Sequence, residues 1–270
     1  MAGLIARISD LFSRFIRADI VKVFSLTSIS TLVRMCTGLV SVKVVASIIG
    51  PAGVALVGQL NNFATILLSF SSGGINGGIT KYVAEYKEDG SAITQFLSNA
   101  LRITVICSLV CALFLIVLHR QLSELVMLSP DYGYVFVIFG ITILLYALNN
   151  MLTSIVNGYK EFRKFVYINI ANSIIGVIFT VGLVLCWQLK GALIAAVSYQ
   201  SVMLFVTLWM LRDTPWLRRS NFSGRFSRAI AVKYSKFTLM TLTSALTLPI
   251  VQMLLLSLIH ISEPTRPEPI

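Results

Sequence analysis

Charged residues are scarce in this sequence, and their scarcity excludes most soluble folds. Asp, Glu, Lys and Arg make up 12% of the 270 residues, whereas hydrophobic residues make up 56% and the mean hydropathy is +0.85. Soluble globular domains carry roughly 25% charged residues, so this chain could not cover a surface that faces water. Glycine, proline and serine show no excess that would indicate disorder. The composition therefore predicts a polytopic membrane protein.

Residue types that carry chemistry are also few. The four cysteines and two histidines form neither a disulfide framework nor a metal-ligand pattern, and we expect the cysteines to pack as small apolar side chains. No paired carboxylates, nucleophile–base arrangement or phosphate-binding loop is present. The sequence thus predicts no enzyme and no cofactor. The net charge of +11 is better explained by basic cytoplasmic connections than by nucleic-acid binding.

Long apolar stretches recur along the chain and predict an all-α, polytopic membrane helix bundle. A transmembrane helix needs about 20 apolar residues, and the connections between the stretches are too short to form an extramembrane domain. The seven predicted spans are 24–49, 53–78, 101–118, 133–157, 166–188, 191–211 and 237–258.

Five segments follow from this pattern. Residues 1–19 alternate apolar side chains and arginines at helical spacing, which predicts an amphipathic helix on an anionic membrane surface. We expect a six-helix bundle over 20–212, a basic cytoplasmic linker over 213–236 and a further helix over 237–258. Residues 259–270 are rich in proline, and we interpret them as a non-native tail that follows a truncated gene. A short, exposed native tail is the alternative.

Basic residues orient the predicted bundle. The amino-terminal segment and the second, fourth and sixth connections hold most of the Lys and Arg, whereas Arg120, Lys190 and Lys43 lie toward the opposite side. Cytoplasmic connections of membrane proteins carry such an excess. The amino terminus is therefore predicted to lie in the cytoplasm.

Polar residues inside the spans are the candidates for a binding site, because polar groups in hydrocarbon are costly unless they face protein or water. Arg34 lies near the middle of the first span, on one face with Gly38 and Ser41. It is either a structural arginine bonded to carbonyls of a neighbouring helix or a cation that awaits an anionic substrate. Lys43 lies about half a turn away from that face and is close enough to the membrane surface to reach it.

Aligned polar faces on four spans favour a hydrated cavity over simple adhesion between helices. The second span ends in a glycine-rich stretch, 73–78, followed by Lys81, where close packing or a helix break is expected. No Asp or Glu lies inside any predicted span, which disfavours a proton relay or a cation site and favours an anionic ligand. The amides singled out within these faces are Asn62, Asn149, Asn150 and Asn172.

Several motifs resemble those of Wzx-type flippases, which export lipid-linked O-antigen or enterobacterial common antigen units. Residues 48–59 resemble the turn between the first two helices of that family, and residues 73–86 resemble the end of its second helix. Residues 157–163 are similar to its fourth-to-fifth junction, and residues 234–240 to the start of its seventh helix. The resemblance covers about residues 20–257.

The resemblance implies the fold of the multidrug/oligosaccharidyl-lipid/polysaccharide exporter superfamily, in which two six-helix bundles face a central cavity. This chain would hold the first bundle and one helix of the second. The implied substrate is an undecaprenyl-pyrophosphate-linked oligosaccharide, moved from the cytoplasmic to the periplasmic leaflet of the bacterial inner membrane by alternating access. The implied partners are the lipid bilayer and the polymerase and chain-length regulator of the same pathway.

The resemblance also implies roles for the candidate residues. Family members carry basic residues at the positions of Arg34, Lys43 and Lys81, which would pair with the pyrophosphate or an acidic sugar. The asparagines would contact sugar hydroxyls. Another polysaccharide or multidrug exporter, a membrane-embedded polymerase or ligase, and an envelope-assembly scaffold remain as alternatives. A scaffold would predict a dry interior.

Overall fold

A computed structural model describes residues 2–73, 76–224, 247 and 251 of the chain. Within this part of the chain every regular element is helical, which confirms the predicted all-α membrane bundle. Among the described residues, four helices are long and apolar enough to cross a membrane. Their candidate spans are Thr27–Ser71, Gly90–Val117, Pro130–Gly158 and Phe162–Leu211. The predicted seventh span and the tail lie outside the described residues, apart from two isolated positions, and the linker is described as far as Gly224.

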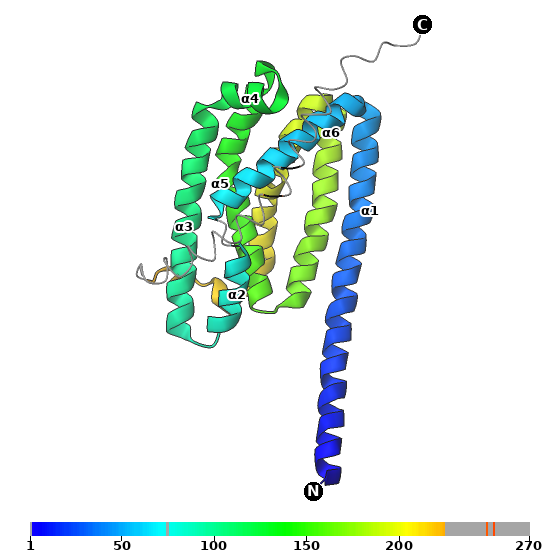
Figure 1. The fold of residues 1–270 in the computed structure, drawn as a ribbon, viewed down its shortest axis with the longest axis vertical. Coiled ribbons are helices and arrows are strands. Elements are labelled where there is room, and N and C mark those ends of the chain that lie inside the picture. Colours follow the sequence, from blue (N-terminus) through cyan, green and yellow to red (C-terminus); the bar gives the residue numbers. More distant parts are fainter. Residues whose placement is uncertain (1, 74–75, 225–246, 248–250, 252–270) are drawn as a thin grey trace.

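Helix α1 (Ala2–Ser71) bends at Gly50, where φ is 70° and ψ is 179°. Glycine adopts this backbone conformation without a steric penalty, and Pro51 then starts the second segment, a position at which its missing N–H is tolerated. The bend confirms the predicted turn between the first two spans. Residues 2–26 continue the first span as helical backbone that extends beyond the bundle (Figure 1), without a break at the predicted boundary near residue 19. Their membrane-surface placement stays a prediction.

Helix α6 (Phe162–Leu211) bends at Gln188, where φ is 48°. The sequence predicted two helices joined at residues 189–190, and the structure places the break one residue earlier. Past the bend, Gly191 lies so close to the Leu183 carbonyl that a side chain would not fit. The two bent helices meet at one end of the bundle (Figure 1), where Val45 and Val184 belong to one buried cluster.

Three predicted boundaries move in the structure. The second span was expected to reach residue 78, but α1 ends at Ser71, and α2 (Asn76–Tyr86) begins after the glycine break. Helix α3 (Gly90–Val117) begins eleven residues before the expected 101, because Asp89 caps it: its Oδ1 accepts from the backbone N of Ser91 and Ala92, both at 3.0 Å. The connection expected at 119–132 is helical in large part.

That connection holds α4 (His119–Met127) and a 3-10 turn, Pro130–Tyr132, before α5 (Gly133–Gly158) begins. Helix α5 packs between α3 and α6 (Figure 1). At its carboxyl end, Gly158 meets Val83 of α2 so closely that an added Cβ would lie 2.6 Å from the Val83 Cβ. Tyr159 stacks on Trp216 beside it, with ring centroids 5.3 Å apart. The end of α2, the junction of α5 with α6 and the described start of the sixth connection therefore lie close together. The side of the membrane that they face stays a prediction.

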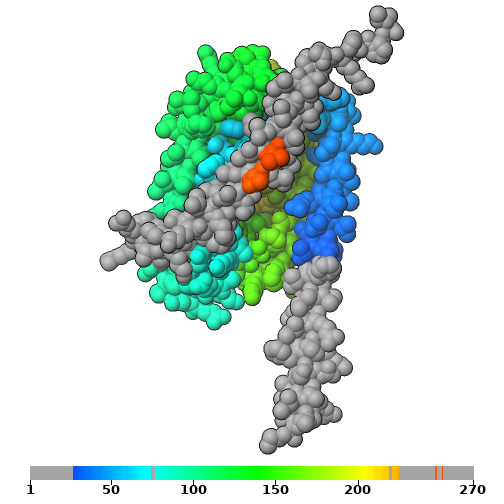
Figure 2. Space-filling model, in the orientation of Figure 1, coloured from blue at the N-terminus to red at the C-terminus, as the bar shows by residue number. Residues whose placement is uncertain are grey.

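The outward faces of the helices are apolar. Leu39 on α1 is 71% exposed and Leu113 on α3 is 65% exposed. Figure 2 shows the first segment of α1, from residue 27 on, along one edge of the molecule. Exposed apolar surface of this kind suits contact with lipid hydrocarbon rather than with water.

Candidate functional site

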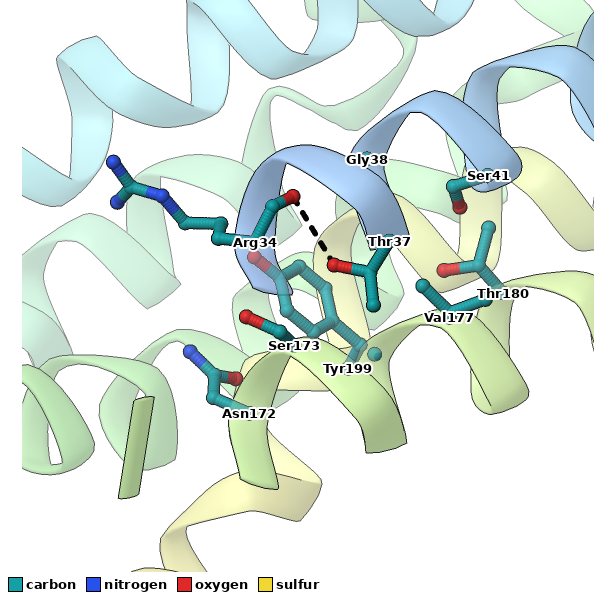
Figure 3. A pocket seen from close by; sticks show the side chains of 10 residues that line it. Arg34, Thr37, Gly38, Ser41, Asn172, Ser173, Val177, Thr180 and Tyr199 are labelled. Carbon is teal, nitrogen blue, oxygen red and sulfur yellow. Dashed lines mark hydrogen bonds between the residues drawn. The ribbon is translucent and has the colours of Figure 1, made fainter. Parts of the chain in front are cut away.

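A cavity of about 220 Å³ lies between the first segment of α1 and helix α6 (Figure 3). It brings together the polar faces that the sequence predicted on the first and fifth spans. Because side chains three or four residues apart share a helix face, each helix lines the cavity with several turns. The lining residues are Arg34, Thr37, Gly38 and Ser41 from α1 and Asn172, Ser173, Gly176, Val177, Thr180 and Tyr199 from α6.

Two hydroxyls of this cavity are held by their own helices. Thr37 Oγ1 donates to the carbonyls of Val33 at 2.8 Å and Arg34 at 3.1 Å, the latter drawn in Figure 3. Ser173 Oγ donates to the carbonyl of Asn169 at 2.9 Å. A hydroxyl that donates to its own helix still has oxygen lone pairs to offer. The cavity therefore presents acceptors to any ligand hydroxyl or amide.

Arg34 supplies the charge of the cavity. Its guanidinium is exposed and extends away from Thr37 and Ser41 in Figure 3. Within the described residues, no carboxylate pairs with it; the two ion pairs there join Lys164 to Glu161 and Arg212 to Asp213. The alternative was a structural arginine bonded to carbonyls of a neighbouring helix. No such bond is present in that part of the chain.

Asn172 contributes an acceptor to the same cavity. Its Oδ1 atom is buried and has no hydrogen-bond partner among the described residues. Buried polar atoms are rarely left without a partner in native proteins. Because this oxygen is buried, a ligand donor reaches it only after a rotation of the Asn172 side chain toward the cavity that this residue lines.

A second, neutral cavity of about 320 Å³ lies between α2, α5 and the start of α6. Thr80 Oγ1 donates to the Ser154 carbonyl at 3.2 Å, and Thr153 Oγ1 donates to the Asn149 carbonyl at 2.9 Å. The remaining polar side chains include two amides from α5. The residues that line this cavity are Thr80, Asn150, Thr153, Ser154, Asn157 and Phe165.

Asn149 lies elsewhere, although it neighbours Asn150 in the sequence. It is 3% exposed, its Nδ2 donates to Gln200 Oε1 at 3.0 Å, and its Oδ1 accepts from Thr207 Oγ1 at 2.7 Å. Both ends of this amide therefore join α5 to α6, and Asn149 lines neither of the two cavities.

The other predicted site residues are dispersed. Lys43 is exposed on α1 and Asn62 is half-buried on the second segment of α1, and both lie outside the linings of the two cavities. Lys81 is exposed beside Thr80 of the second cavity, with its Nζ 5.5 Å from the centroid of the Tyr82 ring. The structure thus unites Arg34 with Asn172 and places Asn150 in a separate cavity.

Tyr199 is a lining residue that the sequence reasoning missed. It belongs to the sixth predicted span, on which no polar face was recognised. A signal was present, since residues 198–201 read Ser-Tyr-Gln-Ser within an otherwise apolar stretch. Across the described ranges, no group of three His, Cys, Asp or Glu side chains gathers as metal ligands would.

Comparison with known proteins shows which sequences this chain resembles. Residues 20–263 match the model of a family described as polysaccharide biosynthesis protein. The lipid III flippases of Escherichia coli (strain K12) and Shigella flexneri are each 25% identical to the chain over 233 residues. These residues cover 86% of this chain, which spans 56% of the length of each relative. No solved structure matches the chain.

Proposed function

We propose that this chain takes part in moving a lipid-linked oligosaccharide across the bacterial inner membrane. The chain belongs to the polysaccharide biosynthesis protein family. The relatives, both flippases of lipid III, support a transport role without catalysis. The proposed substrate is an undecaprenyl-pyrophosphate-linked oligosaccharide, either an O-antigen unit or a related one. Alternating access would carry it from the cytoplasmic to the periplasmic leaflet.

The observation that carries this proposal is Arg34 in the α1–α6 cavity, which pairs with no carboxylate among the described residues. A guanidinium binds phosphate oxygens through several N–H groups at once and keeps its charge at all physiological pH values. An arginine without a carboxylate partner near the middle of an apolar span needs an anion or water. We assign it to the pyrophosphate of the lipid carrier.

Amides would hold the sugars. Asn172, with its unpartnered Oδ1, would accept from a sugar hydroxyl next to Arg34. Asn150 would do the same in the second cavity, whose Phe165 lies about 10 Å from Asn172 along α6, at 1.5 Å rise per residue. Lys81, beside that cavity, would attract an acidic sugar or the arriving pyrophosphate.

The remaining predicted contacts require other arrangements of the helices. Lys43 and Asn62 lie outside both cavities here, so their proposed contacts belong to another state of the alternating-access cycle. Asn149 is left out of the proposed contact set, because both ends of its amide are bonded to protein.

Binding of the bare carrier lipid tests the proposal. We expect the chain in lipid nanodiscs to bind undecaprenyl pyrophosphate, and Arg34→Gln to weaken that binding about tenfold, the equivalent of one lost charge-assisted hydrogen bond. Arg120→Gln is the matched control, since Arg120 is an exposed arginine on α4. Equal affinity of the Arg34 variant and the unmodified chain would contradict the assignment of Arg34.

A further inference from the structure

Tyr199 forms one wall of the Arg34 cavity (Figure 3). Its side chain is half-buried and lies next to Gly176: a Cβ built on that glycine would be 3.4 Å from Cδ2 and 3.5 Å from Cε2 of the ring. A side chain at position 176 would thus contact this side of the ring. Because the position is glycine, the cavity is open toward the ring at this point.

A chain of hydrogen bonds holds the hydroxyl end of this ring. Thr207 donates to Asn149 at 2.7 Å, Asn149 donates to Gln200 at 3.0 Å, and Gln200 Nε2 donates to the Tyr199 hydroxyl at 3.0 Å. The chain starts at the fully buried Thr207 on α6, crosses to α5 and returns to α6 at the cavity. Connected bonds of this kind in a low-dielectric interior restrain their members.

This arrangement decides what Tyr199 can offer a ligand. Its hydroxyl oxygen accepts from Gln200, which fixes the orientation of the ring, and the exposed part of the ring is the apolar group that Tyr199 presents to the cavity. An aromatic face carries a partial negative charge and attracts weakly polarised C–H groups. A pyranose ring presents such a face of C–H groups, flanked by hydroxyls.

We infer that Tyr199 is a specificity-determining residue that stacks on a sugar of the lipid-linked substrate while Arg34 holds the pyrophosphate. The inference rests on the proposed function. The cavity then matches a glycosylated pyrophosphate with three chemistries: a cation for the phosphates, the Asn172 oxygen for a sugar hydroxyl and the Tyr199 ring for the apolar face of the sugar. Asn149 and Gln200 touch no substrate in this scheme and act as positioning residues for the ring.

Two probe lipids separate stacking from phosphate binding. Undecaprenyl pyrophosphate and undecaprenyl pyrophosphoryl-N-acetylglucosamine would be titrated against the full chain in nanodiscs. We expect the sugar-bearing lipid to bind about tenfold more tightly. Tyr199→Ala should remove that preference and leave affinity for the bare lipid unchanged, and Tyr199→Phe should keep most of it. Tyr167→Ala, at a 59% exposed tyrosine of the same helix, should retain the full preference.

Further variants define how the inference could fail. Gln200→Leu frees the ring from its anchor and should reduce the preference while bare-lipid binding persists, which a merely destabilised fold would not produce. An unchanged preference in Tyr199→Ala, or an equal loss for both lipids, would overturn the role of Tyr199 and leave Arg34 untouched. Failure of the unmodified chain to bind either lipid would overturn the proposed function and this inference together.

Discussion

Asn149 and Asn150 show how differently two adjacent amides can act within one helix. The first is buried between α5 and α6 with both ends bonded, and the second faces a polar cavity one helical step away. They are adjacent in the sequence, and both were predicted to contact sugars. Their rotation about the axis of α5 separates them, because consecutive helical residues point about 100° apart.

This difference predicts unequal effects of the two residues on stability. Asn149→Leu leaves Thr207 and Gln200 without their partner, and an unsatisfied buried polar group costs about 1–3 kcal/mol. We expect a lower thermal unfolding temperature in detergent for Asn149→Leu. Asn150→Leu is the matched control and should change stability by less than about 0.5 kcal/mol. Equal destabilisation by the two variants would contradict the placement of Asn149 in the helix interface.

At the scale of elements, helix α3 begins where a carboxylate can cap it. Asp89 accepts from two backbone N–H groups and from the Ser91 hydroxyl at 2.9 Å. The backbone bond from Ala92 first, and then the two bonds from Ser91, lower the pKa of this carboxyl below its ordinary value of 3.8. The cap explains why α3 extends well beyond the apolar stretch visible in the sequence.

The cap predicts a local effect with a defined pH dependence. A carboxyl whose pKa is lower in the folded state stabilises that state above its unfolded pKa, and loses the effect as pH falls through the folded value. At neutral pH, Asp89→Ala should therefore speed hydrogen exchange of the Ser91 and Ala92 amides. Asp89→Asn should retain more protection, because asparagine also caps helices. Identical exchange in Asp89→Ala and the unmodified chain would argue against the cap.

At the scale of the whole molecule, the described part of the bundle has an apolar exterior and includes the two polar cavities beside Arg34 and beside Asn150. The cavity beside Arg34 forms where the first segment of α1 meets α6, and the second forms where α2, α5 and α6 meet. A transport protein needs polar cavities that water can enter, whereas an envelope scaffold would have a dry interior. Access of water to the interior is therefore the decisive property.

Thiol labelling measures that access. In a chain freed of its native cysteines (Cys36, Cys107, Cys111 and Cys186), single cysteines at positions 34 and 172 should react with a membrane-impermeant maleimide. A cysteine at position 149 should stay unlabelled, because that side chain is buried between helices. Protection of all three positions would favour the scaffold.

The sequence alone predicted that this protein lies in a membrane, that its fold is helical and approximately where its spans lie. These properties depend on composition and on apolar length, which each stretch carries by itself. The Gly50–Pro51 bend and the end of α1 just before Gly73 were also readable, because glycine and proline act on the backbone locally. The polar faces that contain Arg34 and Asn172 were recognised in advance by their helical spacing.

Tertiary structure decided how those faces are used. It united Arg34 with Asn172, enclosed Asn149, placed Lys43 outside both cavities and brought Tyr199 to the wall beside Arg34. Such outcomes depend on the rotation of each helix and on which neighbour it packs against, and no local pattern specifies either one. A polar residue in a membrane helix must be satisfied, but only the packed bundle determines whether a neighbouring helix or a ligand satisfies it.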